Sequence, residues 1–200
     1  MKHLKQLLVL TFLIAAVSLN AQKMKVEKGD FKFLKGQKEI NIVLKYDKMK
    51  MYKDKRSEEK YIKERTKELN EKTKGKGDTW AKKWASSREL IWEPKFLELL
   101  NRAKNHNFSV DNADAKYTLI VETTWLYPGY NVGVMKQGAK VTTVLKFVET
   151  ANMDKVKLKI NSKNAPGDTY MGSYSNEDRI GEGYAKTGKS LMKMLNKKVK

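Results

Sequence analysis

Residues 183–190 read GYAKTGKS and match the pattern G-x-x-x-x-G-K-[ST], which forms the phosphate-enclosing loop of nucleotide hydrolases. In that loop, backbone N–H groups and the lysine, here Lys189, contact phosphate oxygens. The chemistry requires a hydrophobic strand that runs into the first glycine and a helix that starts at the lysine. The elements around Gly183 and Gly188 therefore decide whether this string can bind a nucleotide.

The residues before Gly183 are polar and have the character of a helix start rather than of a buried strand. Asn176 is a candidate N-cap, and apolar residues keep helical spacing through the whole string, at Ile180, Tyr184, Leu191 and Leu195. Backbone N–H groups inside a helix are already paired and cannot enclose a phosphate. The sequence therefore predicts a carboxyl-terminal helix with closely packed glycines and a solvated Lys189, and not a nucleotide site.

The rest of the chain offers few groups for catalysis. It has no cysteine, and beyond the first few residues its one histidine is His106, so zinc sites and histidine-assisted nucleophiles lack parts. The acids at 58–59 and 177–178 lie in predicted helix starts, where the helix dipole explains them. A hydrolase with two carboxylates remains an open alternative. We expect a non-enzymatic protein with no catalytic residues, no metal site and no cofactor.

The amino-terminal residues have the composition of a signal peptide. A basic start precedes the apolar run 7–19 and Ala21, a small residue of the kind that precedes a signal peptidase site. The run is short for a membrane span, and an uncleaved anchor is the alternative. We expect a signal peptide over 1–21, cleavage after Ala21, and a periplasmic or secreted mature chain without a transmembrane segment.

The remaining length suits one domain. Residues 22–38 are weakly patterned and are expected to form a flexible amino-terminal segment. Residues 39–200 are expected to form a single α/β domain that carries a charged helical insertion around 57–77.

Hydrophobic patterns place strands and helices along this domain. Strands are predicted by β-branched runs and alternation over 39–46, 108–110, 116–130, 138–150 and 155–160. Helices are predicted from an N-cap at Ser57, from a cap at Asp78 or Thr79, and from a first turn containing Pro94. The order predicts an α/β (α+β) two-layer sandwich: a mixed, mostly antiparallel sheet of about four to five strands with helices packed on one face.

One predicted helix carries a stripe of Trp80, Trp84, Ser87 and Ile91. Such a stripe can stack on a ligand or pack against the sheet. Packing is the commoner use of an apolar helix face, and we favour it here.

The formal net charge is +19, and the excess of positive charge is nearly all lysine. Biased lysine usage and solubility are the simpler explanation; attraction to an anionic surface or an acidic polymer is the alternative. The five arginines are spread along the sequence, so we expect no specific nucleic-acid binding.

A turn region follows the strongest predicted strand. Alternation sends Trp125 and Tyr127 to the same face of that strand, and Pro128 then interrupts the ladder. These aromatic and apolar residues either cover the sheet or form a contact surface. Because loops often carry function and Tyr and Met are enriched at interfaces, we predict that Tyr127, Tyr130 and Met135 bind a protein partner.

In element order, residues 39–195 resemble the periplasmic α/β domain found in the amino-terminal part of TolB and in curli-secretion-type lipoproteins. The pieces that carry the likeness are INIVLKY, PKFLELLNRAKNHNF, DAKYTLIVETTW and KVTTVLKFVE, with a closing helix. The stretches ETTWLYPGYNVGVMKQGAKVTTVLKFVET and RIGEGYAKTGKSL also look like uncharacterised exported proteins of Bacteroidota-type bacteria. The resemblance implies a non-enzymatic envelope module that binds other proteins or supports assembly, with an envelope protein as its unknown partner.

Overall fold

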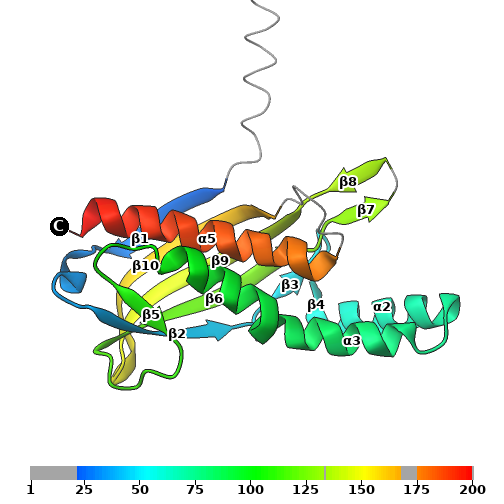
Figure 1. The fold of residues 1–200 in the computed structure, drawn as a ribbon, viewed down its shortest axis with the longest axis horizontal. Helices are drawn as coiled ribbons and strands as arrows, with labels where there is room; N and C mark the ends of the chain where they lie inside the picture. Colours follow the sequence, from blue (N-terminus) through cyan, green and yellow to red (C-terminus); the bar gives the residue numbers. More distant parts are fainter. Residues whose placement is uncertain (1–21, 133, 168–174, 200) are drawn as a thin grey trace, which may run out of the picture.

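The computed structural model describes residues 22–132, 134–167 and 175–199. The predicted signal peptide over 1–21 and its cleavage site after Ala21 lie outside these residues. The described part is a mixed α/β fold in which helices pack against a large eight-stranded sheet (Figure 1). Within it, no helix is both long and apolar enough to cross a bilayer.

The large sheet contains parallel and antiparallel pairs. Its order is β1–β10–β9–β6–β2–β5, and the short strands β3 and β4 extend it beside β6. The central strand β6 lies antiparallel to β9 and parallel to β2. The strands are β1 (Lys23–Gly29), β2 (Glu39–Lys45), β3 (Lys50–Met51), β4 (Arg56–Ser57), β5 (Asn107–Ser109), β6 (Tyr117–Tyr127), β9 (Ala139–Glu149) and β10 (Asn152–Gly167).

The sheet is larger than the four to five strands expected from the sequence. Residues 22–38, expected to be flexible, contain β1 and the short 3-10 helix η2 (Lys32–Leu34). As an edge strand, β1 leaves most of its side chains exposed, and its sequence therefore shows little apolar alternation. Strand β10 extends well beyond the predicted 155–160. Its second half approaches a helix closely, since a Cβ on Gly167 would lie 1.9 Å from the Arg179 carbonyl oxygen. There is little room there for large apolar side chains, so the alternation that predicts a strand is missing.

Two helices, α4 (Glu93–Leu100) and α5 (Asn176–Lys198), lie side by side across one face of the sheet (Figure 1). Helix α5 is capped one residue earlier than predicted, by Ser175, whose Oγ accepts a hydrogen bond from the Asp178 N–H (3.0 Å). The string GYAKTGKS lies entirely inside α5, and Lys189 is exposed. The prediction of a helix in place of a phosphate loop is confirmed.

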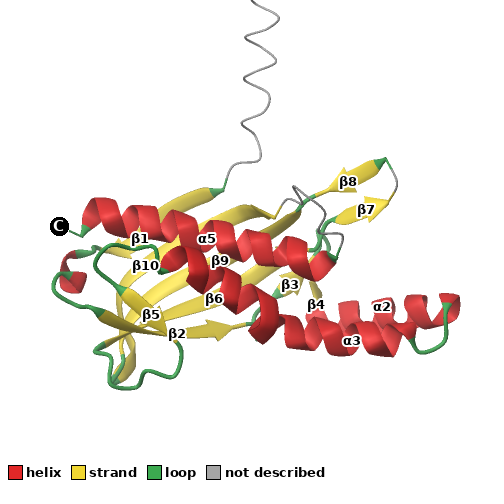
Figure 2. Cartoon of the chain, in the orientation of Figure 1, coloured by secondary structure: helices red, strands yellow, loops and turns green. Residues whose placement is uncertain are grey.

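The other helices form an arm that projects beyond the sheet (Figure 2). They are α2 (Glu58–Lys72) and α3 (Lys76–Ser87), and α3 continues through the π-helical segment η3 (Arg88–Trp92) into α4. The Ser57 N-cap is confirmed, since its side chain accepts a hydrogen bond from the Lys60 N–H. The cap predicted at Asp78 or Thr79 is wrong, because α3 starts earlier, after Gly75 in the left-handed conformation.

The tryptophan stripe packs into the core, as favoured above. Trp84 and Trp92 are fully buried, whereas Trp80 is half-buried. The Trp92 ring stacks on the ring of Tyr184 in α5, with centroids 5.7 Å apart, and the Tyr184 hydroxyl shares a hydrogen bond with Thr123 Oγ1 in β6 (2.6 Å). The Trp84 ring of α3 in turn packs edge-on against Trp92 (5.3 Å), so the helical arm, α5 and the sheet share one core.

Candidate functional site

A second, small sheet carries most of the residues predicted to bind a partner. Strands β7 (Tyr130–Val132) and β8 (Met135–Gln137) pair as a hairpin that projects from the end of β6 (Figure 1). The chain leaves β6 through Pro128 and Gly129, where the ladder was predicted to break. Gly129 has a positive φ (72°), and a Cβ there would lie 2.3 Å from the Gln137 carbonyl oxygen. Only glycine fits this turn, so the turn fixes the root of the hairpin.

The hairpin exposes an apolar surface. Of the eight large hydrophobic residues exposed in the described part of the chain, four lie between positions 130 and 135. Val132 is 63% exposed, Met135 is 61% exposed, and Val134 is fully exposed. Tyr130 is also exposed, at 41%. We call these four residues the hairpin patch. Isolated exposed apolar residues are ordinary, whereas a cluster on a projecting element points to a contact surface.

The three residues predicted to bind a partner have different surroundings. Tyr130 and Met135 belong to the hairpin patch, but Tyr127 lies at the root of the hairpin, in β6. Its hydroxyl donates a hydrogen bond to Gln137 Oε1 (2.9 Å), and its ring packs edge-on against the ring of Tyr52 (5.4 Å). Trp125 and Tyr127 share a face of β6, as predicted, and their rings are nearly parallel. Tyr127 therefore supports the hairpin as well as lining its base.

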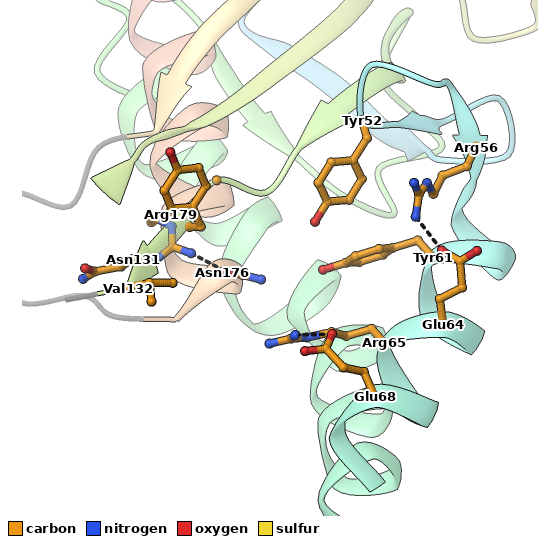
Figure 3. Close-up of a pocket in the computed structure, with 12 residues that line it drawn as sticks. Tyr52, Arg56, Tyr61, Glu64, Arg65, Glu68, Asn131, Val132, Asn176 and Arg179 are labelled. Atoms are coloured by element: carbon orange, nitrogen blue, oxygen red, sulfur yellow. Dashed lines mark hydrogen bonds and ion pairs between the residues drawn. The ribbon is translucent and has the colours of Figure 1, made fainter. Parts of the chain in front are cut away.

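Beside the hairpin, a pocket of about 410 Å³ opens between β7, α2, the β3–β4 turn and the start of α5 (Figure 3). Its walls are aromatic and charged rather than apolar. The lining residues are Tyr52, Arg56, Tyr61, Glu64, Arg65, Glu68, Gly129, Tyr130, Asn131, Val132, Asn176 and Arg179. Three of the five arginines, which look scattered in the sequence, thus line one pocket.

Acids neutralise two of these arginines. Arg56 forms ion pairs with Asp54 (2.7 Å) and with Glu64, and Arg65 pairs with Glu68 (2.6 Å). A side-chain hydrogen bond from Arg56 lowers the pKa of Asp54 below its ordinary value. The pocket therefore presents fixed, charge-balanced donors and acceptors, which suits hydrogen bonding to a polar group better than attraction of a free anion.

Two buried side chains form the floor of the pocket. The Arg179 guanidinium donates to the Pro128 carbonyl (3.4 Å) and to Asn176, so it ties the start of α5 to the hairpin root. Tyr61 is 4% exposed, and burial raises the pKa of its hydroxyl well above the ordinary value. That hydroxyl makes no hydrogen bond of normal geometry with a described residue, although Tyr52 and Asn176 are close enough to affect its pKa.

Side chains that could ligate a metal ion are not clustered among the described residues. These residues contain no cluster of three or more His, Asp or Glu side chains placed to hold a metal ion. His106 does not line this pocket. Its ring nitrogen Nε2 lies 3.3 Å from the Leu34 carbonyl oxygen, and burial lowers the pKa of the imidazole. What the hairpin patch and the pocket offer together is an apolar projection beside a polar recess.

Sequence reasoning missed the pocket because three segments far apart in the chain supply its walls. Tyr52 and Tyr61 lie about the β3–α2 junction, whereas Asn176 and Arg179 come from α5. The one available signal was the small number of arginines, but their spacing along the sequence gave no indication that they meet.

Comparisons with known proteins leave the chain without a family. No protein-family model matches it, and no curated protein matches it. Two structures of a PelC dodecamer from Paraburkholderia phytofirmans are similar to it at 11% and 12% identity, with TM-scores of 0.44 and 0.42; each comparison covers 90% of this chain and 100% of PelC. A neuraminyllactose-binding hemagglutinin homolog from Helicobacter pylori is similar at 15% identity and a TM-score of 0.29, over 86% of this chain and 88% of that one. Likenesses this weak assign neither a family nor a function.

Proposed function

We propose that this protein is an exported, non-catalytic envelope protein that acts as a protein-interaction or assembly module, and that the hairpin patch is its contact surface. The observation that carries the proposal is the exposure of Val132, Val134 and Met135 together on one projecting hairpin. Covering this surface with a partner removes apolar area from water, which is worth roughly 25 cal/mol per Å².

The surroundings of the patch suit a protein partner. Protein interfaces combine an apolar centre with a polar rim, and they are enriched in Tyr, Met and Arg. Here Tyr130 and Met135 lie on the patch, and the adjacent pocket supplies Arg56, Arg65 and tyrosine rings. A partner segment that covers the patch can place a polar side chain in the pocket and meet charge-balanced hydrogen-bonding groups.

Within this proposal, the fold is a two-layer sandwich of the kind that the TolB and curli-secretion resemblance implies. The helices occupy one face of the sheet, and the hairpin leaves the sheet at its end, where a partner can reach it. The hydrolase alternative gains no support from the pocket, because its acids are held in ion pairs with arginines.

Two surface variants test the proposal. Val132→Ser with Met135→Ser should reduce binding to the envelope partner at least tenfold while the thermal midpoint stays within a few degrees, because both side chains are exposed. Val26→Ser with Met153→Ser is the matched control, since it removes an exposed valine and an exposed methionine elsewhere, and it should retain binding.

Site-specific photo-crosslinking in intact cells identifies the partner directly. A photoreactive amino acid at Val134 should give a discrete adduct with one envelope protein in intact cells, and the same residue at Leu90, an exposed position on η3, should not. Equal adducts from both positions, or a double variant that still binds its partner with unchanged affinity, would contradict the proposal.

A further inference from the structure

The face of the sheet opposite α4 and α5 is rich in lysine. On β9 and β10 the helix-facing side chains, such as Val141, Leu145 and Ile160, are fully buried, so the alternate residues point to the other face. The strand registers then place lysines on that face, and we call eight of them the basic sheet face. They are Lys23, Lys25, Lys28, Lys45, Lys50, Lys146, Lys159 and Lys163.

Like charges meet directly across this face. Lys28 of β1 lies opposite Lys159 of β10, which in turn lies opposite Lys146 of β9. Like charges opposite one another on neighbouring strands destabilise a sheet. Glu27 pairs with Lys159 (2.9 Å) and Glu122 pairs with Lys146 (2.8 Å), but in the described part of the chain no ion pair involves Lys25, Lys28 or Lys163. The uncompensated charge makes the face attractive to an anion.

A hollow of about 460 Å³ lies at one end of the basic sheet face. It is lined by Lys50, Lys55, Thr124, Trp125, Thr142, Lys163 and Asn164. The Trp125 indole Nε1 donates a hydrogen bond to the Tyr52 carbonyl oxygen (2.7 Å), so the orientation of the ring is fixed and its polar group is already satisfied. An aromatic ring held among three lysines can pack against a ring-shaped unit that carries negative charge.

We propose that the basic sheet face binds an acidic polysaccharide. Its carboxylate or sulfate groups would contact the lysines, and one sugar ring would pack its C–H face against Trp125 in the hollow. This site is separate from the hairpin patch and does not depend on the function proposed for it.

Two features favour a polysaccharide over other polyanions. Trp125 is half-buried and lines a hollow, so it is poorly placed to insert into a membrane surface, whereas a single ring of a polymer can enter the hollow. No arginine, the residue that suits bidentate phosphate contacts, lines the hollow, and the hollow holds one aromatic ring rather than the series on which successive nucleotide bases stack.

Binding to polygalacturonate of defined length, measured by calorimetry at low and at moderate salt, tests the proposal. The variant Lys25→Gln, Lys28→Gln and Lys163→Gln should bind at least tenfold more weakly than the unmodified protein and show a shallower salt dependence. The matched control Lys186→Gln, Lys189→Gln and Lys193→Gln removes the same charge from exposed positions of α5 and should bind within twofold of the unmodified protein.

Trp125→Phe separates stacking from charge. It should weaken binding several-fold without changing the salt dependence, while its thermal midpoint shows whether the fold is kept. Dextran should not bind. The proposal is overturned if the α5 variant loses as much affinity as the sheet variant, if polygalacturonate does not bind at low salt, or if single-stranded DNA or vesicles of anionic lipid bind more tightly through the same three lysines.

Discussion

At the scale of single residues, Glu122 shows how charge is held on the sheet. Its side chain is 8% exposed and accepts from Lys146 Nζ (2.8 Å) and from Lys48 Nζ (3.0 Å). Burial alone would raise the pKa of this carboxyl, but the hydrogen bonds and charges of the two lysines together lower it. The ionised form is therefore favoured more strongly in the folded protein than in the unfolded chain.

The lowered pKa of Glu122 determines how the stability of the fold changes with pH. The stability contributed by Glu122 is fully present above the unfolded value, about 4.3 for glutamate, and is lost as the pH falls through the lower folded value. Glu122→Gln should therefore flatten the decrease in unfolding free energy between about pH 5 and pH 2. Denaturant unfolding at several pH values across this range measures the pH dependence of the unfolding free energy. Glu71→Gln removes an exposed ion pair on α2 and is the control; it should leave the slope of unfolding free energy against pH nearly unchanged. Equal slopes for the unmodified protein and both variants would show that Glu122 is not coupled to folding.

At the scale of elements, the contact between α4 and α5 depends on Gly188. A Cβ at this position would lie 2.3 Å from the Phe96 carbonyl oxygen, and that atom belongs to the backbone of α4 and cannot move aside alone. Gly188→Ala gains about 1 kcal/mol in helix propensity, but the two helices must separate to admit the methyl group. We expect a net loss of about 1–3 kcal/mol in unfolding free energy. Lys189→Ala, on the exposed side of α5, should change it by less than about 0.5 kcal/mol; a stabilised Gly188→Ala protein would contradict the packing argument.

The elements that sequence patterns predict well are those with one strongly apolar face. Strand β6 and the helix around Pro94 fall in this class, and so does α5, whose spacing excluded a phosphate loop. Edge strand β1 and the second half of β10 were missed because exposure or close approach to α5 removes their apolar alternation. The turn after β6 was predicted from Pro128 and Gly129, but the paired strands β7 and β8 were not, because they are short and exposed. The pocket beside them depends on distances between α2 and α5 that no local pattern encodes.

At the scale of the whole molecule, the expected mature amino terminus is the first residue that the structure describes. Gln22 Nε2 donates to Ser162 Oγ in β10 (2.8 Å), and Gln22 Oε1 accepts from Ser190 Oγ in α5 (2.5 Å). Cleavage after Ala21 would therefore leave every described contact intact. Intact-mass analysis of the exported fraction should give a chain that begins at Gln22. Recovery of the full-length chain from the membrane fraction would support the uncleaved anchor instead.

The helical arm has a consequence for how the molecule opens. Helices α2 and α3 touch each other so closely that a Cβ on Gly77 would lie 2.1 Å from the Thr66 carbonyl oxygen. They meet the rest of the domain mainly at their base, where α2 contacts β3 and β4 and the Trp84 ring packs against Trp92. A unit joined to the core at one end can unfold locally while β6 and β9 stay paired. Amide hydrogens near the arm's tip then exchange with deuterium through this partial opening, and those of the central strands exchange only when the whole domain unfolds.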